Sequence, residues 1–305
     1  ATTPTTFTPK DGETARVFMT IDNPGSPQDI TITEPAHWGW EPTVSFSCSG
    51  ATTVTNNATR TVTASLSAAS PSAACTITNT KRPTITLNKV SIGDTGTFTF
   101  TGTNTWISQD ISTTIAGTAT TGATQALPNS VATAITETVP TGYRLADIDC
   151  SVGGNPTANG TISYYTPDTE SVSFDSGVMA PGAEVNCTFT NVRRRPITLV
   201  KELDPTTDPG LFVLSTSATS GSAHIATSSS GTAASASAEG GAGTSITTEV
   251  DVTSTVTLSE TAGTSTDLAN YLPTFSCDTS PATTDSGNSS FDIVSKLDQQ
   301  EIDNA

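Results

Sequence analysis

Charge and aromatic rings are scarce in this 305-residue chain, at 13% and 6% of the residues. The 12 Lys and Arg residues are outnumbered by 29 Asp and Glu residues, which gives a net charge of −17. Because phosphate binding requires clustered basic side chains, we expect no nucleic-acid partner. No apolar run reaches the roughly 18 residues of a membrane-spanning helix, so we expect no membrane span in this segment.

Residues suited to catalysis or metal binding are also few. The chain has two histidines and five cysteines, and no two cysteines have the CxxC spacing of a zinc site. It has no glycine-rich phosphate loop, and no Ser/His/Asp set or Cys/His pair is evident. We therefore expect no metal site, no cofactor and no enzymatic activity.

The residues that the chain does contain in quantity are Thr, Ser, Ala and Gly, arranged in alternating segments between turn residues. Thr and Val favour β-strands, and no long segment has the period of an amphipathic helix. The sequence therefore predicts an all-β protein built of small β-sandwiches.

An internal repeat organises the chain. Residues 74–79 match residues 186–191, and each stretch ends in an Asn four positions after a Cys. Equivalent strand ends recur at Cys48, Cys150 and Cys277. The connections between repeats are short and contain proline, which favours a stiff rod. The matches predict three tandem domains, at residues 1–81, 82–194 and 195–305.

The repeat also pairs the cysteines within domains: Cys48 with Cys75, and Cys150 with Cys187. Disulfides form in oxidising compartments, so we expect an extracellular protein at the cell surface. Cys277 has no partner, because the third domain lacks the final strand that would supply one. We expect either a fragment of a longer array or a strand donated by another chain, and we favour the fragment.

Three strands of the second domain each place one polar side chain among apolar neighbours. Side chains alternate between the two faces of a strand, so residues two positions apart share a face. The three groups are Ile85, Leu87 and Lys89; Ile135, Glu137 and Val139; and Cys187, Phe189 and Asn191. Burying Lys89, Glu137 and Asn191 singly is costly, so we expect them to lie together.

An amine, a carboxylic acid and a carboxamide in one apolar core can form an amide cross-link. Desolvation favours the neutral forms of Lys89 and Glu137. The neutral amine can attack the Asn191 carbonyl while the acid shuttles protons, and ammonia then leaves. We predict a Lys89–Asn191 isopeptide bond. The alternatives are a lysine that guards a strand edge, an Asn that starts a turn, and a disulfide at Cys187 that has replaced the bond.

The stretch 137–143 carries Glu137, Pro140, Gly142 and Tyr143 in the order E-x-x-P-x-G-Y. It resembles the signature of the CnaB-type (SpaA-like, prealbumin-like) repeat domains of bacterial surface proteins and pili. Lys89 on the first strand and Asn191 on the last strand complete that family's pattern. The resemblance implies immunoglobulin-like β-sandwiches of prealbumin topology, arranged in tandem, and a role in a stalk or an adhesin.

The resemblance extends to the other two domains in part. The first keeps Glu34 and Asn79, with Lys10 as the candidate amine of a second, weaker isopeptide site. The third keeps Lys201 and Glu260, but no Asn follows them, so no bond is predicted there.

Together these observations predict a structural extracellular protein, a segment of a bacterial stalk, adhesin or pilus-like filament. Its expected partners are other copies or further repeats of the same protein. One alternative is an adhesive module that binds host or surface glycans or a host protein, with Trp38 and Trp40 as the contact region. Another is a polymer subunit completed by a strand of a neighbouring chain.

Overall fold

The computed structural model describes residues 14–18, 26–155, 160–165, 170–219, 235–252, 254–277, 283–286 and 290–292. These residues form β-strands, turns and one 3-10 turn at Leu268–Asn270, with no α-helix among them. The prediction of an all-β fold is confirmed. No helix in this described part of the chain is long and apolar enough to cross a membrane. The chain divides into two compact units, residues 1–80 and 81–305.

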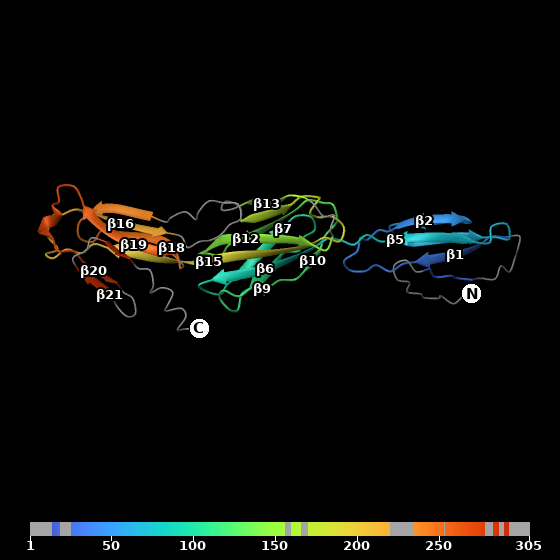
Figure 1. Ribbon diagram of the computed structural model, residues 1–305, viewed down its shortest axis with the longest axis horizontal. Coiled ribbons are helices and arrows are strands. Elements are labelled where there is room, and N and C mark those ends of the chain that lie inside the picture. The colour runs from blue at the N-terminus through green and yellow to red at the C-terminus, as the bar shows by residue number, and fades with distance from the viewer. Residues whose placement is uncertain are drawn as a thin grey trace. The chain divides into compact units, whose positions relative to one another are not determined.

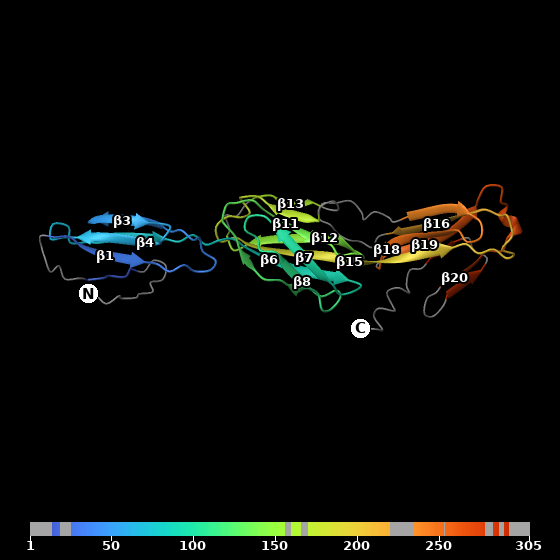
Figure 2. The same cartoon turned by 180° about the vertical axis from the view of Figure 1, so that it is seen from behind.

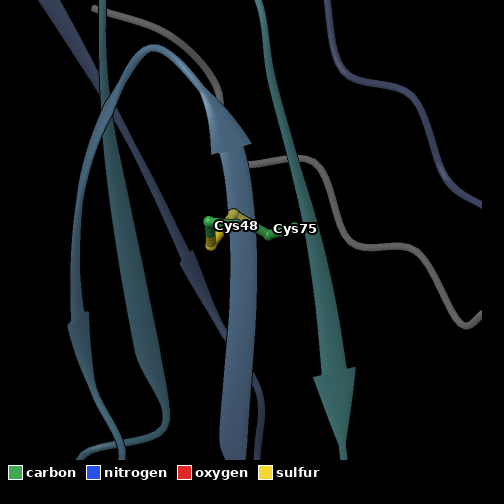
Figure 3. The surroundings of a disulfide bond; sticks show 2 residues. All are labelled: Cys48 and Cys75. Carbon is green, nitrogen blue, oxygen red and sulfur yellow. A yellow bond between two sulfur atoms is a disulfide. The ribbon is translucent and has the colours of Figure 1, made fainter.

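The first unit contains two small sheets. The three-stranded sheet has the order β1-β4-β3, with bounds Gln28–Thr33, Thr61–Leu66 and Thr52–Asn56. The second sheet pairs β2 (Ser45–Gly50) with β5 (Ala73–Thr78). Cys48 and Cys75 lie directly opposite each other in this pair and form a disulfide (Figure 3), as the repeat predicted.

In the second unit, residues 82–194 form two facing sheets (Figures 1 and 2). One sheet has the order β10 (Gln125–Ala126), β6 (Thr84–Ile92), β15 (Glu184–Val200) and β12 (Tyr143–Gly153). The short strand β9 (Thr120–Thr121) also pairs with β6. The other has the order β13-β14-β11-β7-β8, with bounds Ile162–Tyr165, Ser171–Phe174, Thr133–Thr138, Thr97–Gly102 and Gln109–Ser112.

The strands β6 and β15 are neighbours and run parallel, which brings residues about 100 positions apart into one ladder. Their inward faces alternate with outward faces residue by residue, as a half-buried strand requires. The inward side chains meet those of the facing sheet in one core, which includes Ile85, Leu87, Phe98, Phe100 and Phe189. Cys150 and Cys187 are opposite each other on β12 and β15 and form the second predicted disulfide.

Residues 195–292 form a further group of strands in the same unit. They are β16 (Phe212–Thr219), β17 (Ser235–Gly240), β18 (Ser245–Asp251), β19 (Thr255–Ala262), β20 (Thr274–Cys277), β21 (Thr283–Ser286) and β22 (Ser290–Asp292). One sheet has the order β17-β16-β19-β22, and β20 pairs with β21. The side chain of Cys277 lies outside the described residues, so its lack of a partner stays a prediction.

One strand, β15, crosses the boundary predicted at residues 194 and 195 and joins the two groups of strands. It pairs with β6 and β12 in its first part and with β18 from Arg194 onward. A small apolar cluster of Ala146, Val192 and Val252 packs beside the crossing point. The division into three domains stays a prediction, but no loop separates the last two predicted domains.

Asp251 anchors this junction. Its carboxylate accepts hydrogen bonds from the Arg144 guanidinium, with Nε at 3.1 Å from Oδ2, and lies 3.8 Å from Arg194 Nε. The Asp251 side chain is 8% exposed, whereas the two arginine side chains keep 24% and 34% of their surface. The carboxylate is therefore the buried member of the group, and it offsets two nearby positive charges.

We expect Asp251→Ala to lower the free energy of unfolding of the second unit by about 2–3 kcal/mol. Breaking a fully buried ion pair costs about 3–5 kcal/mol, and the partial exposure of both arginines reduces that cost. Urea denaturation measures this change in the free energy of unfolding. Asp94→Ala is the matched control, because Asp94 is 47% exposed and lies 3.9 Å from Arg193; its effect should stay below about 1 kcal/mol. Equal effects of the two substitutions would contradict the anchoring role.

Candidate functional site

The structure brings Lys89, Glu137 and Asn191 together in the core of segment 82–194. Lys89 comes from β6, Glu137 from β11 in the facing sheet, and Asn191 from β15 beside β6. Lys89 Nζ lies 2.5 Å from Asn191 Oδ1, 3.1 Å from Glu137 Oε1 and 3.0 Å from the carbonyl oxygen of Phe189. All three residues are buried, at 0%, 2% and 0% exposure.

The E-x-x-P-x-G-Y stretch explains how Glu137 is held. The turn after β11 is closed by a hydrogen bond from Tyr143 N–H to the Pro140 carbonyl oxygen, and Gly142 within it adopts a φ of 81°. Glycine suits that left-handed conformation because it has no Cβ. The Tyr143 hydroxyl donates to the Thr95 carbonyl oxygen at 2.8 Å, and its ring packs edge-on against Phe98. The motif therefore fixes the end of the glutamate strand over the core.

Aromatic rings surround the three polar groups. Lys89 Nζ lies 4.3 Å from the centre of the Phe98 ring, and the Phe100 and Phe189 rings pack edge to face beside it. This apolar burial lowers the pKa of Lys89 to about 8, although the nearby Glu137 opposes the shift. Burial likewise raises the pKa of Glu137, against the opposing influence of Lys89.

Several atoms of the site have unused hydrogen-bonding capacity. Apart from the contact with Lys89, neither carboxyl oxygen of Glu137 makes a hydrogen bond of regular geometry, and neither does Asn191 Nδ2. Asn191 is nevertheless close enough to Glu137 to influence its pKa. Buried polar atoms are normally paired, so these atoms are unusual for a core that only provides stability.

This arrangement can carry out aminolysis of the Asn191 side chain. A neutral Lys89 amine faces the carboxamide carbonyl, and a protonated Glu137 beside it can donate a proton to the carbonyl oxygen and later to the leaving nitrogen. The carbon–nitrogen bond to Lys89 forms, the bond to Asn191 Nδ2 breaks, and ammonia carries away that nitrogen. The low pKa of the amine and the high pKa of the acid both favour the neutral forms that this step uses.

In the first unit, only two of the three candidate residues, Glu34 and Asn79, are described by the structure. Lys10 lies outside the described residues, so its assignment stays a prediction. The other two candidates do meet: Asn79 Nδ2 donates to Glu34 Oε1 at 2.7 Å. The cation beside them is Arg60, which lies 3.4 Å from Glu34 Oε2 and 3.3 Å from Asn79 Oδ1.

The sequence alone does not predict the role of Arg60. The residue lies in the turn between β3 and β4 with a φ of 59°, and alternation gives no information about the direction of a turn side chain. A basic residue after the turn-forming stretch Asn56-Asn57 is ordinary on a surface, yet Arg60 is only 6% exposed.

In segment 195–305, Lys201 and Glu260 form an ion pair with Nζ and Oε2 separated by 2.7 Å. Lys201 Nζ also lies 4.0 Å from the centre of the Phe212 ring, as Lys89 does over Phe98. No asparagine bonds to this pair among the residues that the structure describes. The pair repeats two of the three groups of the Lys89 site.

Trp38 and Trp40, which were considered for glycan or protein binding, are 73% and 41% exposed in the first unit. No cluster of His, Cys, Asp or Glu that could hold a metal ion occurs in the described ranges.

Segment 82–194 is thus a two-sheet β domain whose first and last strands are neighbours and whose core holds a Lys, Glu and Asn centre. Residues 85–193 match the SpaA_4 family model, a prealbumin-like fold domain. This part of the chain is therefore similar to SpaA-like domains of prealbumin-like fold, as the E-x-x-P-x-G-Y stretch indicated. A search of curated proteins finds none that matches the chain.

Proposed function

We propose that the protein is a structural segment of a bacterial surface stalk, adhesin or pilus-like fibre. In this proposal, an isopeptide bond between Lys89 and Asn191 and the disulfides Cys48–Cys75 and Cys150–Cys187 make it resistant to pulling. The prealbumin-like match of residues 85–193 supports the class, and the two disulfides are compatible with an extracellular location.

The observation that carries the proposal is the distance of 2.5 Å between the Lys89 amine and the Asn191 carbonyl oxygen, with Glu137 beside both. Held in this way, the reacting groups need no encounter step. Effective molarities of well-oriented intramolecular reactions reach about 10⁵–10⁸ M, which is enough to drive a step that free lysine and asparagine do not undergo. Each centre reacts once, so the reaction matures the domain and is not a catalytic turnover.

The position of the centre gives the bond a mechanical role. Lys89 is on the first strand of the domain and Asn191 on its last strand, and these strands are parallel neighbours. A bond between them would let tension pass from one strand to the next through covalent chemistry. The hydrogen bonds of the two sheets would then carry little of the load.

Intact mass after disulfide reduction tests this proposal. We expect the wild-type protein to weigh one ammonia less than its sequence predicts, because the cross-link releases one ammonia. Lys89→Ala and Glu137→Ala should each restore the full mass, since the first removes the nucleophile and the second the proton carrier. Lys81→Ala is the matched control, because this exposed lysine pairs with Glu184 at the surface. A wild-type protein of full mass would refute the cross-link.

A further inference from the structure

Arg60 and Glu170 occupy equivalent positions next to the two glutamates. Arg60 comes directly before β4, which pairs antiparallel with β1, and Glu34 directly follows β1. Glu170 comes directly before β14, which pairs antiparallel with β11, the strand that contains Glu137. The carbonyl oxygen of Arg60 accepts from the backbone N–H of Glu34 at 3.0 Å, and that of Glu170 accepts from Glu137 at 3.0 Å. Both residues have a positive φ, 59° and 43°. The same position of the backbone therefore presents an Arg to one glutamate and a Glu to the other.

In the first unit, the Arg60 side chain occupies the place that an attacking amine would need. Its guanidinium contacts the Glu34 carboxylate and the Asn79 carbonyl oxygen, and it donates to the main-chain oxygens of Glu34 and Glu41 at 3.1 and 3.2 Å. A guanidinium stays protonated in proteins and has no lone pair for attack.

In segment 82–194, the equivalent residue has the opposite charge. Glu170 is partly buried and adjoins Glu137 across the ladder. Burial is the main cause of the raised pKa of Glu137, and the nearby charge of Glu170 raises this pKa further. Glu170 therefore favours the protonated form of Glu137, which is the form that can donate a proton in the reaction.

We propose that this position determines whether a Glu–Asn pair of this protein reacts: Glu170 is a positioning residue that promotes the Lys89–Asn191 bond, and Arg60 keeps the Glu34–Asn79 pair as a non-covalent, charged clamp. The inference rests on the proposed cross-link. It predicts that Glu34, Arg60 and Asn79 are held together by ion pairing and hydrogen bonds, and that Asn79 keeps its side-chain nitrogen even though Lys10 is present in the chain.

The test follows cross-linking in the full chain during cell-free synthesis, by mass at successive times. We expect Glu170→Arg to slow the loss of ammonia at least about tenfold, because proton transfer by a positioned acid contributes about 10²–10⁴-fold to rate. Glu170→Gln, which removes the charge without reversing it, should react at a rate between those of the Arg variant and the wild type. Arg is compatible with this backbone position, since Arg60 also has a positive φ.

A pH series separates an electrostatic effect from a folding defect. With Glu170→Arg, the optimum pH of the reaction should move to lower values, because Glu137 must then be protonated against a neighbouring positive charge. A variant that still forms the Cys150–Cys187 disulfide but reacts slowly at every pH, with an unchanged optimum, would overturn the inference.

Two further results decide the remaining points. If the Glu170→Arg variant reacts as fast as the wild-type protein, this inference is overturned but the proposed cross-link is not. If the wild-type protein never loses ammonia, the proposed cross-link is overturned as well. Fragment masses report on the first unit: we expect the fragment with Asn79 to be unmodified, and a bond from Lys10 to Asn79 would overturn the role of Arg60.

Discussion

Segment 82–194 is expected to extend under load in the Lys89→Met variant but not in the wild-type protein. Lys89 and Asn191 are 102 residues apart, so a bond between them hides that whole stretch from a force applied through the strands. Without the bond, the stretch can extend by up to about 340 Å at roughly 3.3–3.6 Å per residue. The 37-residue span between Cys150 and Cys187 stays hidden until that disulfide is reduced. Oxidised Lys89→Met should therefore lengthen by about 220 Å, and reduced Lys89→Met by the full amount.

Single-molecule force spectroscopy measures these lengths, and Met keeps the volume of the lysine stem without its amine. Equilibrium unfolding of the reduced protein gives a second readout. Closing a loop of about 100 residues contributes about 4.7 kcal/mol in the chain-entropy treatment of cross-links, so the variant should lose stability of that order. Lys81→Met is the control and should behave as wild type in both experiments. A wild type that extends as far as the variant would contradict the covalent tie.

The rate of cross-link formation is expected to fall about 100-fold between pH 7 and pH 5. The pKa of Lys89 is about 8, so roughly a tenth of the amine is neutral at pH 7 and only about a thousandth at pH 5. Above pH 8 the fraction of neutral Lys89 amine rises little more, whereas a Glu137 side chain that has lost its proton can no longer donate one. Its pKa is raised by burial, which places this loss well above the usual range for a carboxylic acid. The rate should therefore pass through a maximum.

This profile is measured by transferring the freshly synthesised chain to buffers of different pH and following the loss of ammonia by mass over time. Glu137→Gln is the informative variant, because glutamine has the same shape but neither titrates nor shuttles a proton. It should react slowly and should lose the alkaline decline while keeping the acidic one. A rate that does not change between pH 5 and pH 7 would show that neutral Lys89 is not the nucleophile.

Strand alternation made much of the central fold and site predictable. Ile85, Leu87 and Lys89 share a face in the sequence pattern, and all three are fully buried in β6. The same argument selected Glu137 and Asn191, because a polar residue at an apolar position of the pattern must be satisfied inside the core. The repeat of cysteine positions similarly gave both disulfide pairs.

Strand alternation does not predict features that depend on turns or on the pairing of neighbouring strands. Arg60 reaches its partners from a turn with positive φ, where no periodic signal tells which way a side chain points. The basic run Arg193-Arg194-Arg195 ahead of Pro196 lies within β15, where Pro196 pairs opposite Glu249. Proline is tolerated there because this part of the strand has a single described partner, β18.

The unbroken course of β15 restricts insertions and deletions at the junction. Phe189 and Asn191 face the core of segment 82–194, and Ile197 and Leu199, also at odd-numbered positions, pack against Val250, Val256 and Leu258 further along the chain. One residue added between Val192 and Pro196 would reverse this parity and turn Ile197 and Leu199 outward into water. Natural variants of this protein should therefore change length here by an even number of residues or not at all, whereas an ordinary flexible linker would accept any number.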